Sequence, residues 1–150
     1  MTTVHASAVL VGARAVLIRG PSAAGKSRLA WELIEAGRRG AAPFSRLVGD
    51  DRVHLQAIGG RLLVRPAEAL AGLIELRGVG ILRRDHEPCA VIGLVVDLAA
   101  ADAERLPEHG QTIVEGITIP RLAVAPGIAA LPLVLAVVTS SAAATALKPI

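Results

Sequence analysis

The chain has 150 residues and a mass of 15.4 kDa, the size of one domain with its own core, so we expect a single domain over residues 1–150. Hydrophobic residues make up 53% of the chain but aromatic residues only 1%, which predicts an aliphatic core and argues against nucleic-acid binding by base stacking. The net charge of +3 is carried by scattered arginines, a weak indication of anionic ligands. Cys89 is the only cysteine, which excludes an internal disulfide and fits a cytoplasmic protein.

The first elements are expected to be two short strands and a helix. Residues 7–11 and 15–18 flank a Gly-Ala-Arg turn, which predicts an antiparallel pair. Residues 27–36 place their apolar side chains on one helical face, and Gly37 stands where a C-cap belongs. Trp31 on this helix is interpreted as a core or interface residue.

The rest of the chain favours strands. Alternating residues around Gly59-Gly60 predict a hairpin, a short strand precedes it, and a fully apolar strand follows later. The expected elements are a strand over 46–49, a hairpin over 53–57 and 61–65, a turn or short helix over 66–70, a strand over 90–96, a short helix or loop over 99–109 and two strand pieces over 112–124.

The apolar run over 128–138 raises the alternative of a membrane span. Pro132 and the group Thr139-Ser140-Ser141 interrupt it, and eleven residues are about half of the ~20 that a spanning helix needs. We therefore expect a buried strand or helix and no membrane anchor.

A phosphate-binding loop stands between the second expected strand and the helix. Its glycines let the backbone N–H groups point at phosphates, its lysine can reach the β and γ oxygens, and its serine can ligate Mg²⁺. We expect ATP to bind along residues 20–28, with Mg²⁺ as cofactor. These residues are Gly20, Pro21, Ser22, Ala23, Ala24, Gly25, Lys26, Ser27 and Arg28.

Two adjacent acids, Asp50 and Asp51, end the strand over 46–49. Phosphoryl transfer needs a metal ligand and a group that accepts the proton of the attacking hydroxyl, and paired acids beside a phosphate loop can supply both. A solvated turn is the alternative. Glu75 and Arg77, flanked by apolar residues, could equally be the exposed side of a strand. Asp97 ends an apolar strand as a Walker B aspartate does, and is the rival metal ligand.

Together these motifs resemble the catalytic domain of the HPr kinase/phosphorylase family over roughly residues 4–127. The resemblance rests on the phosphate loop, on Val4-His5, on the run Leu-Val-Gly-Asp-Asp, and above all on Gly-Leu-Ile-Glu-Leu-Arg-Gly-Val-Gly-Ile-Leu at 72–82. The family's usual N-terminal domain has no counterpart, as in the short versions of some bacteria. The implied fold is an α/β phosphate-loop nucleotide-binding domain of the phosphoenolpyruvate carboxykinase-like type.

The resemblance implies an ATP- and Mg²⁺-dependent serine kinase, with a phosphorylase activity as well, that acts on a small HPr-like phosphocarrier protein in a regulatory role. It implies that Asp50 is the general base, that His5 and Lys26 assist catalysis, and that Ser27, Asp51 and Glu75 hold the metal. A nucleotide-binding switch and a small-molecule kinase are the alternatives.

The chain departs from the family pattern at three places. Ala23 replaces a glycine in the loop, at a cost of about 1 kcal/mol if the position needs positive φ. Arg28 stands where an acid is common. Ile128 replaces the arginine of a Pro-Gly-Arg-Asn motif, so we expect slow phosphorolysis, with Arg121 as a conceivable substitute. The sequence leaves open whether the chain forms a homo-oligomer. The charged terminal helix through which longer relatives assemble has no counterpart, which argues against a hexamer.

Overall fold

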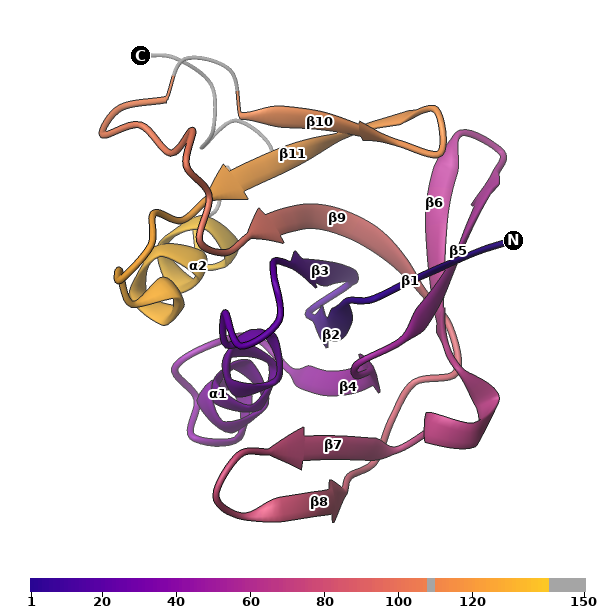
Figure 1. Cartoon of the computed structure of the whole chain (residues 1–150). Coiled ribbons are helices and arrows are strands. Elements are labelled where there is room, and N and C mark those ends of the chain that lie inside the picture. Colours follow the sequence, from indigo (N-terminus) through magenta and orange to yellow (C-terminus); the bar gives the residue numbers. More distant parts are fainter. Residues whose placement is uncertain (108–109, 141–150) are drawn as a thin grey trace.

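The computed structural model describes residues 1–107 and 110–140, and in these ranges a nine-stranded sheet carries two helices on one face (Figure 1). A separate two-stranded hairpin lies beside the first helix. The strands of the large sheet are β1 Thr2–Val4, β2 Ser7–Val11, β3 Arg14–Arg19, β4 Ser45–Gly49, β5 Val53–Ile58, β6 Arg61–Pro66, β9 Ala90–Asp97, β10 Gln111–Val114 and β11 Ile117–Ala123. The hairpin consists of β7 Leu73–Leu76 and β8 Gly80–Arg83, and the helices are α1 Lys26–Arg38, the short 3-10 helix η1 Glu68–Leu70 and α2 Ala130–Val138.

The central strand β9 organises the sheet. The strand order is β1-β5-β6-β9-β3-β2-β4, and β11, with β10 beside it, also pairs with β9. Strand β9 runs parallel to β3 and β11, whereas its pairing with β6 and the pairings of β2 with β3 and β4 are antiparallel. The carboxyl ends of β3, β9 and β11 therefore meet at one edge, where open α/β sheets bind their ligands.

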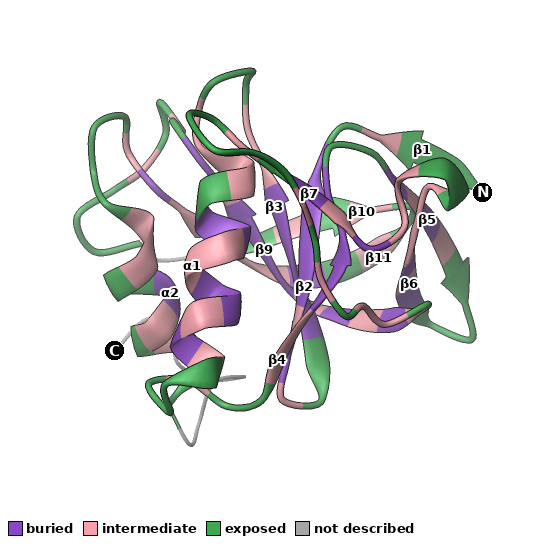
Figure 2. Cartoon of the chain, turned by 90° about the horizontal axis from the view of Figure 1, so that it is seen from below, coloured by how far each residue is buried: buried purple, intermediate pink, exposed green. Residues whose placement is uncertain are grey.

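Two hydrophobic clusters fill the two faces of the sheet. In β3, Val16 and Ile18 belong to the cluster under α1 and α2, while Ala15 and Leu17 belong to the cluster on the other face. Burial on both faces explains why the central strands β3 and β9 are continuous apolar runs (Figure 2). The core is aliphatic, as the composition predicts.

Helix α1 extends further than the sequence indicates. It buries Leu29, Leu33 and Ile34 on one face, but it continues through Gly37 to Arg38. The expectation that Gly37 is the C-cap was wrong. A Cβ at position 37 would lie 2.6 Å from the Cβ of Ser45, so this glycine allows the last helical turn to approach β4.

Most of the remaining expected elements are confirmed. The hairpin over β5 and β6 is present, residues 68–70 form a single 3-10 turn, and β10 and β11 match the two pieces expected over 112–124. The described part of 99–109, which ends at residue 107, contains no helix, while residues 108–109 lie outside the described ranges. Strand β1 had no sequence signal.

The apolar run near the C-terminus forms α2, as one of the two expected possibilities. Val134 is its buried residue, and half-buried neighbours pack against the cluster under α1. Within the described ranges, no helix combines the length and the apolar character needed to cross a membrane.

Candidate nucleotide and phosphoryl-transfer site

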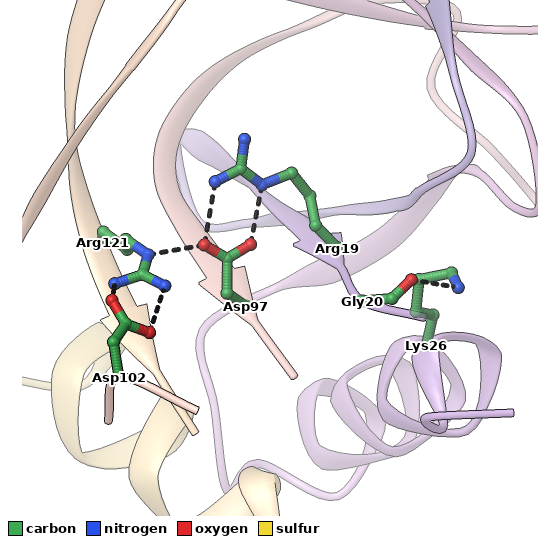
Figure 3. A network of polar contacts seen from close by, with 6 residues as sticks. All are labelled: Arg19, Gly20, Lys26, Asp97, Asp102 and Arg121. Atoms are coloured by element: carbon green, nitrogen blue, oxygen red, sulfur yellow. Dashed lines mark hydrogen bonds and ion pairs between the residues drawn. The ribbon is translucent and has the colours of Figure 1, made fainter. Parts of the chain in front are cut away.

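The phosphate loop connects the carboxyl end of β3 to the first residue of α1. Gly25 caps the helix in the left-handed region with φ 96°, and Lys26 begins it. The Lys26 ammonium folds back across the loop and donates to the carbonyl oxygen of Gly20 at 2.8 Å (Figure 3). It also donates to the carbonyl oxygen of Pro21 at 3.2 Å. The loop thus combines a helix N-terminus with a positive charge, the arrangement that binds phosphate.

Ala23 adopts a backbone conformation that favours glycine. Its φ is 67°, so the condition that makes alanine costly at this position is met. Gly25 and Gly20 also have positive φ, at 96° and 156°. Ala23 therefore holds about 1 kcal/mol of strain or more, in a loop whose backbone N–H groups are expected to bind phosphate.

Asp50 is the most enclosed acid of the site. Only 3% of it is exposed, and it follows the last residue of β4. The Ser27 hydroxyl lies 2.8 and 2.9 Å from its two carboxylate oxygens, and the Ser7 hydroxyl donates to Oδ1 at 2.6 Å. The backbone N–H of Glu75 donates to Oδ2 at 3.2 Å. Residues from the phosphate loop, β2 and β7 therefore converge on one carboxylate.

The strand register explains this convergence. Ser7, the first residue of β2, pairs with Ile18 near the end of β3, while Ala8 pairs with Gly49 at the end of β4. Because β2 is antiparallel to both neighbours, its start lies beside both of their ends. The phosphate loop and the two acids consequently share one edge of the sheet.

The other expected site residues are more exposed. Asp51 has φ 67° and an exposed side chain, and the side chain of Glu75 is also exposed although its backbone contacts Asp50. His5 is exposed in the turn between β1 and β2. Arg28 points to solvent and its Nε lies 3.8 Å from Glu32, while Ile128 is 55% exposed.

Asp97 is engaged by arginines. Arg19 donates from Nε and Nη2 to its two oxygens at 2.7 and 2.8 Å, and Arg121 donates from Nε to Oδ2 (Figure 3). Arg121 also forms a bidentate pair with Asp102 at 2.9 and 3.0 Å. This network joins the ends of β3, β9 and β11 next to the phosphate loop.

The pKa values follow from these contacts. Burial opposes ionisation of Asp97, but the hydrogen bonds and charges of Arg19 and Arg121 outweigh it and lower the pKa of Asp97 below 3.8. Hydrogen bonds from Arg121 likewise lower the pKa of Asp102, and both acids raise the pKa of Arg121. Asp97 is therefore an ion-pair partner, which disfavours the Walker B interpretation of its strand.

Sequence reasoning did not identify Ser7 or the pairing of Arg19 and Arg121 with Asp97. Ser7 is fully buried in an otherwise apolar strand. A serine in such an apolar run was the one sequence feature that could have indicated a buried hydrogen-bond donor. Arg19 and Asp97 each end an apolar strand, but their partnership depends on the parallel pairing of β3 with β9, which no local pattern gives.

The fold and this site define a mixed α/β domain with a phosphate loop. The model of the HPr Serine kinase C-terminal domain family matches residues 1–141, and the chain belongs to this family. In structure it is similar to the Hpr(Ser) kinase/phosphatase from Coxiella burnetii, with a TM-score of 0.73, 25% identity, and coverage of 93% of this chain and 94% of that one.

Curated relatives are similar over part of their length. The HPr kinase/phosphorylase of Streptococcus thermophilus is 45% identical over 82 residues, which are 54% of this chain and 24% of that protein. The HPr kinase/phosphorylase of Limosilactobacillus reuteri is 32% identical over 135 residues, 81% of this chain and 40% of the relative. The chain thus spans the C-terminal domain region, well under half of these relatives' length.

Proposed function

We propose that this chain is the catalytic domain of an ATP- and Mg²⁺-dependent protein-serine kinase whose substrate is a small HPr-like phosphocarrier protein. The observation that carries the proposal is the contact of Ser27, the hydroxyl of the phosphate loop, with both oxygens of Asp50. A phosphate loop joined to an acid at a neighbouring strand end is the machinery of phosphoryl transfer. We assign the fold, within the mixed α/β class, to the phosphoenolpyruvate carboxykinase-like type.

The donor set suits Mg²⁺. Ser27 and Asp50 offer only oxygen atoms, which this ion prefers, and Mg²⁺ at nucleotide sites needs few protein ligands because phosphates and water supply the rest. Among the described residues, no group of three or more His, Cys, Asp or Glu could hold a metal ion, so phosphates and water would have to supply most of the ligands. Ser27 would hold Mg²⁺ with a carboxylate beside it, and the ion would offset charge on the transferring phosphate.

The geometry favours exchanging the roles that the sequence suggests for the two acids. Asp50 is buried and already accepts from Ser27, Ser7 and the backbone of Glu75, so a docking protein's serine has little access to it. Asp51 is its exposed neighbour. In our proposal Asp50 orients Ser27 and the metal, Asp51 accepts the proton of the attacking serine, and Lys26 stabilises the phosphates.

The test is transfer of labelled phosphate from ATP to a purified HPr-like carrier protein, with Lys26→Ala as the inactive control. Label on a serine of the carrier supports the proposal. ATP binding without transfer would identify a nucleotide-dependent switch instead, and label on a small metabolite would identify a small-molecule kinase.

A further inference from the structure

A second basic site lies at the base of the β7–β8 hairpin. A cavity of about 430 Å³ opens there between the hairpin, the first half of β4 and the segment that follows β8. This volume lies within the range of small-molecule pockets, ~300–1,000 Å³. Its lining residues are Arg46, Gly72, Arg83, Arg84, Asp85 and His86.

The lining is strongly cationic. Three arginines, a histidine and one acid, Asp85, line the cavity. Arg46 is partly neutralised because its Nη1 lies 3.0 Å from Glu87, and its guanidinium lies over the ring of Phe44. Arg83 is exposed and adds a second positive charge at the rim.

Arg84 is held rigidly in the wall. Its guanidinium lies 4.5 Å from the centroid of the Trp31 ring on α1, and its Nη1 donates to the carbonyl oxygen of Arg83 at 2.8 Å. Its Nε is buried and, among the described residues, is the only buried side-chain nitrogen or oxygen without a hydrogen-bond partner. A buried N–H of a cation left unpaired is costly. Because this N–H is buried, an anion reaches it only after a small movement of the wall, and the pairing would then remove that cost.

Gly72 keeps the cavity open. With φ 77°, its backbone approaches the wall so closely that a Cβ would lie 3.2 Å from both His86 Nδ1 and the Arg84 carbonyl oxygen. A side chain at this position would therefore crowd the cavity between the two residues. Glycine therefore suits position 72 for two reasons: the positive φ and the lack of space for a Cβ.

The cavity is distinct from the nucleotide site. None of residues 20–27 lines it, and Arg46 is the second residue of β4 whereas Asp50 follows the last one. At roughly 3.3 Å per residue this separates Arg46 from Asp50 by about 13 Å along the strand.

We propose that this pocket binds a small phosphate-bearing anion, either inorganic phosphate or the phosphate group of a metabolite. Planar guanidinium groups pair with phosphate oxygens through parallel hydrogen bonds. The three arginines that line the cavity carry more positive charge than Asp85 and the Glu87 partner of Arg46 together offset. The volume of the cavity suits a small ligand, and its polar wall does not suit an apolar one. This site is independent of the proposed kinase activity.

Trp31 provides a direct measurement. It is the only tryptophan of a chain that has no tyrosine, and it touches Arg84, so its fluorescence reports on the pocket wall. The titration uses the full chain with Lys26→Ala, which removes the lysine of the nucleotide site, and follows fluorescence together with equilibrium dialysis of labelled inorganic phosphate. We expect saturable binding of one phosphate per chain. Methyl phosphate as a second titrant distinguishes free phosphate from a phosphate monoester, and binding of either supports the site.

Arg83→Gln in this background should weaken binding at least about tenfold, the loss of one charge-assisted contact. Because Arg83 is exposed, this variant should fold normally. Arg61→Gln, which removes another exposed arginine at the start of β6, is the matched control and should bind as before. Absence of saturable binding to the Lys26→Ala chain, or equal affinity of the Arg83 and Arg61 variants, would overturn the proposal.

Discussion

At the scale of single residues, Asp50 shows how a buried charge is accommodated. A carboxylate that is only 3% exposed needs hydrogen-bond donors in place of water. Asp50 accepts hydrogen bonds from two serine hydroxyls and one backbone N–H. Ser27 is part of the phosphate loop, whereas Ser7 is the first residue of β2 and is fully buried. The Ser7 hydroxyl is therefore best understood as a structural support for Asp50.

Ser7→Ala should destabilise the fold by about 1.5–3 kcal/mol, the range for a hydrogen bond to a charged group. Urea denaturation followed by circular dichroism measures the free energy of unfolding. Ser45→Ala is the control, since its hydroxyl donates to the Pro43 carbonyl oxygen, a neutral acceptor, and should contribute about 1 kcal/mol or less. Equal losses for the two variants would show that Asp50 does not depend on Ser7.

The two neighbouring acids should separate kinetically. Asp51→Asn should lower turnover by about 100-fold or more with an unchanged Mg²⁺ requirement, because it removes a general base. Asp50→Asn should instead raise the Mg²⁺ concentration needed for half-maximal activity, since it disturbs Ser27. Kinase assays over a Mg²⁺ series measure both quantities. The reverse pattern would restore the assignment that the sequence resemblance implies.

Ala23 should be the loop position where glycine is tolerated best. Ala23→Gly relieves the strain at φ 67° while adding chain entropy to the unfolded state, so the two effects nearly cancel. Ala24→Gly gains no such relief and loses a methyl group packed against the core. We expect the Ala23 variant to be at least about 1 kcal/mol more stable than the Ala24 variant in thermal unfolding. A less stable Ala23 variant would contradict this.

At the scale of elements, three parallel strand ends are joined by the pairs of Asp97 with Arg19 and Arg121. Asp97→Asn should cost about 1–3 kcal/mol, below the value for a fully buried pair because the arginines are partly exposed. The Mg²⁺ requirement of the proposed kinase activity should not change. A raised requirement with intact stability would support the Walker B interpretation after all.

The pH dependence has a defined sign. The pKa of Asp97 is lower in the folded chain than its usual 3.8. The stability that the ionised Asp97 contributes to the folded chain is therefore fully present above pH 3.8, and it is lost as the pH falls through the pKa of the folded state. The stability difference between the parent chain and Asp97→Asn should therefore be constant near neutral pH and shrink below pH 3.8. Asp102→Asn, which alters a side chain that is 67% exposed, is the control and should have a small effect.

Elements with a local signal were predictable from sequence. The hairpin of β5 and β6 alternates around two glycines, and α1 has a clear apolar face. Strand β1 was not predictable, because its three residues form a strand only through pairing with β5. The extension of α1 through Gly37 was not predictable either, because the close approach of Gly37 to Ser45 of β4 is a contact between distant segments that the local preference of glycine for a helix end does not reveal.

At the scale of the whole molecule, the sequence predicted which residues form the proposed nucleotide site, but not which of them contact one another. The loop and the paired acids are contiguous motifs. The hydrogen bond from Ser7 to Asp50 and the ion pair of Arg19 with Asp97 instead depend on strand register. The pocket below the β7–β8 hairpin likewise combines segments from three places in the chain. Contacts between distant segments are what a single sequence does not reveal.

The overall distribution of positive charge also bears on the direction of the reaction. Phosphorolysis brings an inorganic phosphate against a phosphoserine, and at an effective dielectric near 20 each pair of unit charges at 4 Å costs roughly 4 kcal/mol. Besides Lys26, the two arginines near the strand ends are already paired with acids and offset this repulsion poorly. Arg19 is paired with Asp97, and Arg121 is shared between Asp97 and Asp102.

We therefore expect the proposed kinase reaction to proceed while dephosphorylation by inorganic phosphate is slow. Ile128→Arg should raise the rate of dephosphorylation at least about tenfold, because it restores a cation at the position where the family pattern has an arginine. Ile128 is 55% exposed, so a longer side chain can be accommodated there. The measurement is pyrophosphate release from serine-phosphorylated carrier in millimolar phosphate, with Arg121→Gln as the comparison. In the Arg121→Gln chain, positions 121 and 128 both lack a charge. If this chain released pyrophosphate as fast as it phosphorylates the carrier, neither arginine position would be needed and the prediction would be wrong.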